Sequence, residues 1–307
     1  MSTDNIHIVV DAAESCCASC GKSEVDDMQL KKCDACDLVR YCSDECRTDH
    51  RPQHAVMCKD RVAELRDDVL FKQPESSYLG DCPICFLPHP IDDTSIENAW
   101  MQSCCSKLIC EGCAYVNWLH HLEKSLEETC PFCRHPNPKT QEEVHLNEMI
   151  RVGANDPVAM LKVGVSYFND RDYDSAFAYF TKAAELGDVM AHYNLSILYK
   201  KGNGVEKDKE MELFLLEEAA IGGHPDARYN IGLYEAINGR TDRAVKHFII
   251  GANLGHDDSL IELKECYANG DVSKDDFAAA LRSHQAAVDA TKSSQREEAA
   301  KAEAIEF

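Results

Sequence analysis

The stretch of sequence that decides this fold reads Cys82-Pro-Ile-Cys85, then Cys104-Cys105, then Cys110-Glu-Gly-Cys113, and finally Cys130-Pro-Phe-Cys133. Two cysteines separated by two residues lie on one tight turn and can hold one edge of a tetrahedral zinc ion. Three such turns and one adjacent pair supply eight ligands, enough for two closed, four-coordinate sites. A segment of this length buries too little apolar surface to fold alone, so the pattern predicts that bound metal stabilises it.

The alternative interpretation of these cysteines is a disulfide framework, which belongs to oxidising compartments. Residues 1–13 contain no basic region followed by an apolar core, and no apolar run reaches the roughly 18 residues that a membrane span requires. The spacing of the pairs is also typical of metal ligands. We therefore expect the 17 cysteines to be reduced, in the cytosol or the nucleus, between which the sequence does not choose.

The four pairs resemble those of a RING finger, a cross-braced fold with two zinc ions that in many families recruits a ubiquitin-conjugating enzyme. The resemblance implies that the first and third pairs bind one zinc ion, and that the second and fourth pairs bind the other. The implied ligands are Cys82, Cys85, Cys110 and Cys113 for one site, and Cys104, Cys105, Cys130 and Cys133 for the other.

Further residues decide what the resemblance implies about activity. Ile84 and Trp118 stand for the hydrophobic contacts with a conjugating enzyme, and Arg134 stands for the basic residue that bridges to ubiquitin. Two features depart from the family pattern: Lys107 stands where the second pair has its usual histidine, and Trp118 comes one residue later than the common register. The resemblance thus predicts the RING fold and leaves ligase activity open.

Residues 17–58 contain a second complete ligand set, in four pairs of which the last two have helical spacing. Side chains at i and i+4 lie on one face of a helix, as a metal site on a helix requires. The segment resembles the MYND finger, including its Tyr41-Cys42-Ser43 step. The resemblance implies that Cys17, Cys20, Cys42 and Cys46 bind one zinc ion and that Cys33, Cys36, His54 and Cys58 bind another.

MYND fingers generally bind short proline-containing peptides, often beside a tryptophan that precedes the ligand histidine. Arg51 occupies that place in this chain, so the aromatic wall for a proline is lost. Peptide binding and a purely structural role of this finger remain alternatives. Cys16 is left over as a bystander, and the two fingers together predict four zinc ions, two in each.

From about residue 142 onward the cysteines end, apart from Cys266, and alanine-rich amphipathic helices follow. The segment 191–195 matches 227–231 at a spacing of 36 residues, and further copies begin at 159 and 259. One helix pair cannot bury its apolar stripe, but a stack of pairs can. The copies resemble Sel-one-like repeats, α-solenoid relatives of tetratricopeptide repeats that typically bind proteins.

The predicted fold class is two small cross-braced zinc-binding fingers of α+β type, followed by an all-α solenoid of helical repeats. Within the solenoid we expect a loop at 202–208 and a capping box at Ser273 and Asp276. The predicted segments are a disordered N-terminus (1–15), the first finger (16–58), a linker with a short helix (59–80), the second finger (81–136), a linker (137–149), the solenoid (150–292) and an acidic, alanine-rich tail forming a frayed or disordered helix (293–307).

The composition narrows the functions. The formal net charge is −22 and no basic patch is segregated in the sequence, which disfavours nucleic-acid binding. Closed zinc shells leave no position for a reacting water, so the zinc is expected to be structural, with no other cofactor.

Two functions stay open. In one, the second finger recruits a ubiquitin-conjugating enzyme while the solenoid selects a protein substrate; in the other, the chain is a non-catalytic adaptor for proteins, without membrane contact.

Overall fold

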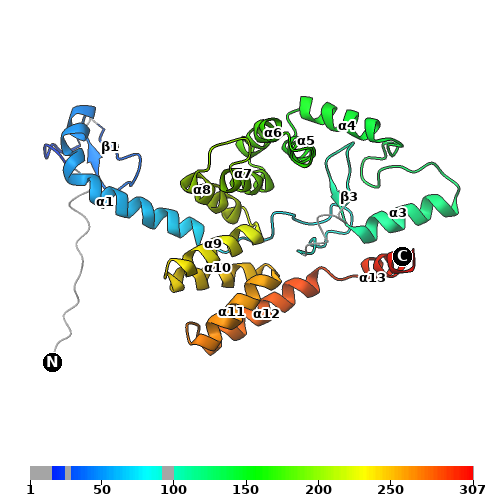
Figure 1. Cartoon of the computed structure of the whole chain (residues 1–307). Helices are drawn as coiled ribbons and strands as arrows, with labels where there is room; N and C mark the ends of the chain where they lie inside the picture. The colour runs from blue at the N-terminus through cyan, green and yellow to red at the C-terminus, as the bar shows by residue number, and fades with distance from the viewer. Residues whose placement is uncertain (1–15, 25–28, 92–99, 307) are drawn as a thin grey trace. The chain divides into compact units, whose positions relative to one another are not determined.

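The computed structural model describes residues 16–24, 29–91 and 100–306, so the N-terminal segment predicted to be disordered lies outside the described residues. The chain divides into two compact units, residues 1–72 and residues 73–307 (Figure 1). None of the helices in the described part of the chain is both long enough and apolar enough to cross a membrane.

The first unit is a small finger built on one long helix. Strand β1 (Lys31–Lys32) pairs antiparallel with β2 (Arg40–Tyr41), and α1 (Asp44–Leu70) follows. The Ser43 hydroxyl caps α1 by accepting a hydrogen bond from the Cys46 amide at 3.2 Å. The structure differs here from the expected separate linker helix, because α1 runs without interruption from the finger to Leu70. Residues 59–70 contain neither glycine nor proline, so nothing ends the helix earlier.

The second unit begins with the second finger. Strands β3 (Trp100–Met101) and β4 (Leu108–Ile109) pair antiparallel and lead into α3 (Glu111–Glu123). Its buried core consists of Ile109 and three cysteines, with Cys85 and Ala114 packed against them. So little apolar surface agrees with the expectation that metal contributes to the stability of this finger.

Helix pairs stack side by side after the finger, as Figure 1 shows. The loop predicted at 202–208 is confirmed between α7 and α8. Of the capping box, the structure shows the N-cap, because the Asp276 amide donates to the Ser273 hydroxyl at 3.1 Å. The helices are α4 (Gln141–Gly153), α5 (Pro157–Asn169), α6 (Tyr173–Glu185), α7 (Val189–Lys201), α8 (Lys209–Ile221), α9 (Pro225–Ile237), α10 (Thr241–Asn253), α11 (Asp257–Asn269) and α12 (Lys274–Ala290).

The core of the solenoid repeats one packing motif. Gly164 on α5 lies against the buried ring of Phe180 on α6, and a Cβ built at Gly164 would come within 2.7 Å of that ring. Gly232 on α9 stands in the same relation to Phe248 on α10, at 2.5 Å. A residue without a side chain on one helix thus receives a large ring from the next, which explains why the repeats need small residues at these positions.

The finger and the solenoid are tied together within the second unit. Tyr78 of the linker donates its amide to the Gly223 carbonyl at 3.3 Å and stacks on the ring of His224, with centroids 4.5 Å apart. At the other end of the unit, residues expected to form a frayed or disordered tail instead form α13 (Ser294–Glu306), which packs on α3 of the finger. The C-terminal helix is therefore part of the folded structure.

Candidate metal centres

The structure brings the predicted ligands together in four clusters. Within each cluster the sulfur or nitrogen atoms all lie within 4.8 Å of one another. The clusters are Cys17, Cys20, Cys42 and Cys46; Cys33, Cys36, His54 and Cys58; Cys82, Cys85, Cys110 and Cys113; and Cys104, Cys105, Cys130 and Cys133. Among the described residues, Cys16 and Cys266 lie in none of these groups.

The spacing of the sulfur atoms fits a tetrahedral ion. Zinc–sulfur bonds of 2.3 Å place two ligand sulfurs about 3.8 Å apart, whereas a disulfide needs about 2.05 Å. The sulfurs of Cys42 and Cys46 are 3.6 Å apart and those of Cys85 and Cys110 are 3.7 Å apart. In the second cluster the separation of Cys33 and Cys58 is 3.8 Å. The geometry is that of metal ligands, so the disulfide alternative is excluded for these pairs.

The backbone of the turns has the conformation that this geometry requires. In five of the turns, the residue after the second cysteine has a positive φ, which is uncommon for residues other than glycine. Its amide donates back to the start of the turn, as from Phe86 to the Cys82 carbonyl at 2.8 Å and from Arg134 to the Cys130 carbonyl at 3.0 Å. The Cys110–Cys113 pair differs, because Ala114 after it belongs to α3. The residues with positive φ are Gly21, Asp37, Phe86, Ser106 and Arg134, at 73°, 57°, 57°, 56° and 64°.

The adjacent pair Cys104 and Cys105 is explained by the same turn. The Ser106 amide donates to the Gln102 carbonyl at 2.8 Å, so Gln102 occupies the position that the first cysteine has in the other turns. Cys105 is then the regular second cysteine, and Cys104 reaches the cluster from one position earlier. The Cys104 sulfur lies 3.3 Å from that of Cys133, and the Cys105 sulfur lies 3.9 Å from that of Cys130.

His54 is the one histidine in the four clusters of the described chain. It is buried, and its Nε2 lies 3.1 Å from the Cys36 sulfur. One turn earlier on α1, the ring of His50 stacks on it and accepts or donates a hydrogen bond at 3.1 Å with the Tyr41 hydroxyl. The histidine is thus oriented toward the cluster by its own helix.

The electrostatics of the clusters also favour a cation. A hydrogen bond from the Cys110 thiol lowers the pKa of Cys82 to about 3, against the opposing effect of burial. The same hydrogen bond, together with burial, raises the pKa of Cys110 above its ordinary value. One thiolate therefore keeps its neighbour protonated, and complete ionisation of the cluster requires a divalent cation. Closed sulfur and nitrogen shells of this kind are typical of structural zinc, so all four clusters are capable of binding it.

The second finger carries a groove of about 490 Å³ on its surface. Ile84 and Arg134, both predicted from the sequence, meet there, whereas Trp118 lies outside the groove with its ring beside that of Tyr115. The lining residues are Ile84, Cys85, Cys113, Val116, Asn117, His120, Pro131, Arg134 and Gln295.

Sequence reasoning missed Asn117, which lines this groove in place of Trp118. Its side-chain amide donates to the Thr129 carbonyl at 2.9 Å, and its backbone carbonyl accepts a hydrogen bond from Nδ1 of the buried His121 at 2.6 Å. The signal was present in the spacing, because Asn117 follows the ligand Cys113 by four residues and Trp118 follows it by five. His121 is packed and hydrogen-bonded, so its role is to join α3 to the fourth pair.

The first finger has a groove of about 550 Å³ in which Arg51 lies. Arg47 and Lys59 of α1 line it as well, together with Tyr41 and Val62. Arg47 is paired with Asp34 at 3.0 Å, while the ion pairs found in the described chain include neither Arg51 nor Lys59. This groove offers positive charge at the place where the MYND family has a tryptophan.

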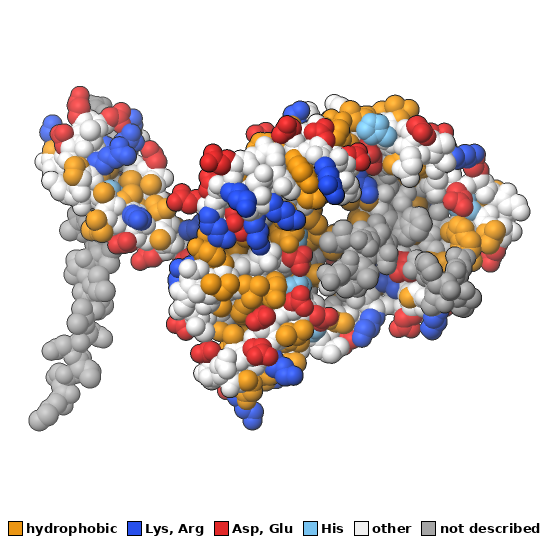
Figure 2. Space-filling view, viewed as in Figure 1, with side chains coloured by type: hydrophobic (Ala, Val, Ile, Leu, Met, Phe, Trp, Pro, Cys, Tyr) orange, Lys and Arg blue, Asp and Glu red, His pale blue; other side chains and the backbone are white. Residues whose placement is uncertain are grey.

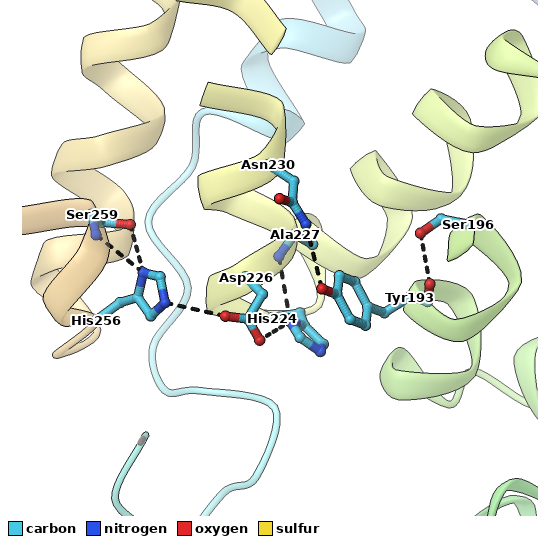
Figure 3. A network of polar contacts seen from close by, with 8 residues as sticks. All are labelled: Tyr193, Ser196, His224, Asp226, Ala227, Asn230, His256 and Ser259. Carbon is cyan, nitrogen blue, oxygen red and sulfur yellow. Dashed lines mark hydrogen bonds and ion pairs between the residues drawn. The ribbon is translucent and has the colours of Figure 1, made fainter. Parts of the chain in front are cut away.

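A serine, a histidine and an aspartate meet in the solenoid, as Figure 3 shows. His256 Nδ1 accepts a hydrogen bond from the Ser259 amide at 3.3 Å, so the ring proton lies on Nε2, which faces Asp226 at 3.2 Å. His256 is the N-cap of α11, and Ser259 is fully buried. The arrangement is a helix cap, because a buried serine offers no access to a substrate.

His256 belongs to a series of caps that repeats along the solenoid. Asp156, Asp188 and His224 cap α5, α7 and α9 in the same way, each accepting an amide hydrogen bond from its helix. Their spacings of 32 and 36 residues are those of the predicted repeat, which assigns these polar residues to the repeat architecture rather than to a separate site.

The site and the fold thus define a zinc-finger protein with a helical-repeat solenoid. The family model of the MYND finger matches residues 17–58, and that of the Sel1 repeat matches residues 157–188, 189–224 and 225–256. The chain contains a MYND finger and three Sel1 repeats, and these boundaries coincide with the helix pairs α5–α6, α7–α8 and α9–α10. The clusters of the second finger are consistent with the RING-like resemblance.

The curated relatives match part of this chain. "Protein sel-1 homolog 2" of Homo sapiens is 33% identical over 112 residues, which are 34% of this chain and 16% of that protein. "DAP3-binding cell death enhancer 1" of Mus musculus is 25% identical over 165 residues, 41% of this chain and 32% of that protein. This chain therefore spans less than a third of the length of these relatives.

Among solved structures, a Sel1 repeat protein from Oxalobacter formigenes is similar, with a TM-score of 0.43 and 24% identity over 56% of this chain and 71% of that one. The Sel1 repeats and the zinc finger together indicate a role in protein interaction. On the face shown in Figure 2, basic side chains of the solenoid lie next to acidic ones.

Proposed function

We propose that this protein is a protein-interaction adaptor in which the second finger is held at a fixed position on the solenoid. The attachments within the second unit carry this proposal. The linker is fixed by the stacking of Tyr78 on His224, and the Asn147 side chain of α4 donates to the Ser103 hydroxyl of the finger at 3.3 Å. A finger fixed on a solenoid can present two partners to each other at a set distance.

In this proposal the sixteen cluster residues are the ligands of four structural zinc ions, two in each finger. Reduced thiols are needed for that role, which supports the cytosol or the nucleus as the place of action. We keep the predicted division into two fingers and a solenoid, except that residues 294–306 are assigned to the second finger on which they pack. For the first finger, Arg51 and Lys59 favour an acidic peptide over a proline-rich one.

A RING-type ubiquitin ligase is the second candidate function. The observation that favours it is the meeting of Ile84, Pro131 and Arg134 in one groove, where a conjugating enzyme would dock. Against it stands the polar Asn117, which lines the groove where the family usually has an aromatic contact. A RING finger supplies no nucleophile, so in this function Ile84 would bind the enzyme and Arg134 would stabilise the reacting complex.

The experiment that separates the two candidates is ubiquitin discharge from a broad panel of conjugating enzymes, with zinc content measured in parallel. The adaptor proposal expects no acceleration by the wild-type protein with any enzyme. Acceleration that is lost in Ile84→Ala and Arg134→Ala, with zinc retained, would establish the ligase instead.

The adaptor proposal itself is tested by identifying the proteins that bind to the full-length chain with quantitative mass spectrometry. The wild type is compared with two variants. Ile84→Asp alters the finger groove, and Ile237→Asp alters an apolar side chain of α9 that is 85% exposed. An adaptor loses different partners in the two variants. Loss of the same partners in both, or of none, would contradict two separate binding surfaces.

A further inference from the structure

The C-terminal helix α13 approaches the second finger very closely. Gly112 of α3 lies against the backbone of α13, and a Cβ built at that glycine would come within 2.8 Å of the backbone amide nitrogen of Arg296. Ala299, one turn further along α13, is 1% exposed. The two helices therefore pack with their backbones close together, which only small residues allow.

Arg296 reaches from this helix into the first zinc turn of the finger. Its Nη1 donates to the Pro88 carbonyl at 2.6 Å, and its Nη2 donates to the Leu87 carbonyl at 3.2 Å. The same Nη2 lies 3.7 Å from the sulfur of Cys85, within hydrogen-bonding distance for sulfur. One guanidinium thus binds both the backbone of the turn and one of its ligand atoms.

These contacts are of the kind that support a metal site from outside. Hydrogen bonds from a charged donor are about twice as strong as neutral ones. A donor to a ligand atom fixes its orientation and offsets the negative charge of a site made of four thiolates. Arg296 also donates to the Thr291 carbonyl at 2.6 Å, which fixes the start of α13 to the end of the solenoid.

We propose that α13 is the outer support of the metal site formed by Cys82, Cys85, Cys110 and Cys113, with Arg296 as its positioning residue. Docking of the C-terminal helix holds the turn 82–88 in place and slows the loss of zinc from that site. The inference rests on the ligand assignment proposed above, and it holds for both the adaptor and the ligase.

The docked helix also borders the groove of the finger, because Gln295 lines it beside Ile84 and Arg134. Two consecutive residues of α13 therefore connect the turn 82–88 with the groove of the second finger. Arg296 faces the zinc turn while Gln295 faces the groove.

The test is the rate at which an excess of a chromogenic chelator removes zinc from the purified full-length protein. In Arg296→Ala, one zinc ion per chain is expected to leave about tenfold to hundredfold faster than in the wild type. Ala299→Asp, which places a charge in the α13–α3 contact, is expected to do the same. Cys82→Ser in the Arg296→Ala background removes the fast ion and so assigns it to this site.

Two variants serve as matched controls. Arg282→Ala removes an exposed arginine of α12, and Glu298→Ala changes an exposed residue of α13 itself. Both are expected to release all four ions at the wild-type rate. Arg296→Lys keeps one charged donor and is expected to give an intermediate rate.

Wild-type release of every ion in both Arg296→Ala and Ala299→Asp would overturn the proposal. If Arg296→Ala loses helical circular dichroism, Arg296→Lys decides, and an unchanged rate in that folded variant overturns the proposal equally. Fewer than four zinc ions in the wild type would instead show that the ligand assignment is at fault.

Discussion

The two fingers use the same ligand chemistry but are supported in different ways. In the first finger, α1 carries Cys46, His54 and Cys58, and the surrounding contacts, such as Arg47 with Asp34, come from the finger itself. In the second finger, α3 carries only Cys113 of the clusters. Its support comes from residues far along the chain, namely Tyr78 stacked on His224 and Arg296 on the first zinc turn. The difference supports our proposal that the first finger is complete by itself, whereas the second relies on contacts from α13 and, through its linker, from the solenoid.

The largest effects are expected from loss of a zinc ligand, because structural zinc contributes roughly 10–16 kcal/mol of apparent binding free energy in small fingers. Cys17→Ser should remove zinc from the first finger only and leave the helical circular dichroism of the solenoid unchanged. Cys82→Ser should remove the zinc ion held by Cys82, Cys85, Cys110 and Cys113 and also release α13. Loss of most helical signal in Cys17→Ser would break the distinction between the two fingers.

The next largest effect is expected in the solenoid core. Phe248→Ala leaves a cavity against Gly232 and should lower the free energy of unfolding of the solenoid by about 3–5 kcal/mol, measured by urea denaturation. Because the second finger depends on the solenoid, its zinc should be lost in the same transition while that of the first finger is retained. Ile237→Ala, at an exposed position, is the control and should change stability by less than about 0.5 kcal/mol.

The comparison also shows what the sequence could and could not predict. Ligand pairs are local patterns, so the spacing of cysteines and His54 identified the pairs, and the resemblance to the two finger families implied how they combine into the four clusters that the structure brings together. The Sel1 repeats were equally local, since matching segments recur along the sequence within the ranges 157–188, 189–224 and 225–256. The support of the second finger could not be predicted, because Arg296 and Cys85 are separated by 211 residues and no periodicity links them. The acidic, alanine-rich tail was expected to be a frayed or disordered helix, and its docking depends on a close approach to Gly112, which lies far away in the sequence.

A moderate effect of pH is expected at the stacking contact that anchors the linker. Burial lowers the pKa of His224 to about 4, against the opposing charge of Asp226. In the unfolded chain the histidine takes up a proton below about pH 6.5, so acid favours unfolding and the stability present above that pH is lost as it falls toward 4. The loss from this residue reaches about 3 kcal/mol.

The contribution of His224 is isolated by comparing the wild type with His224→Asn, since asparagine also caps helices well. Urea denaturation between pH 7.5 and pH 5 should give a smaller slope of stability against pH in the variant. Asp226, which faces the histidine, has a lowered pKa and affects stability only at still lower pH. Equal slopes of stability against pH in the wild type and His224→Asn would show that His224 does not cause the acid sensitivity.

The smallest effect is expected for Tyr78→Phe. No hydrogen-bond partner of the buried Tyr78 hydroxyl is found in the described part of the chain, while the ring makes the stacking contact with His224. Removing the hydroxyl should therefore change the free energy of unfolding by less than about 0.5 kcal/mol, or raise it slightly. The substitution breaks no hydrogen bond and leaves no buried partner unpaired. Leaving a buried hydrogen-bonding group unpaired costs about 1–2 kcal/mol. A larger fall in the free energy of unfolding of Tyr78→Phe would mean that the hydroxyl anchors the linker.

The metal content of the intact protein, measured by native mass spectrometry, tests most directly that both fingers are complete zinc-binding units. We predict four zinc ions per chain, because four clusters each place their ligand atoms within 4.8 Å of one another. A mass with two zinc ions would contradict this, since it would leave one of the two fingers without metal. A mass with three would assign the vacant position to the adjacent pair Cys104 and Cys105.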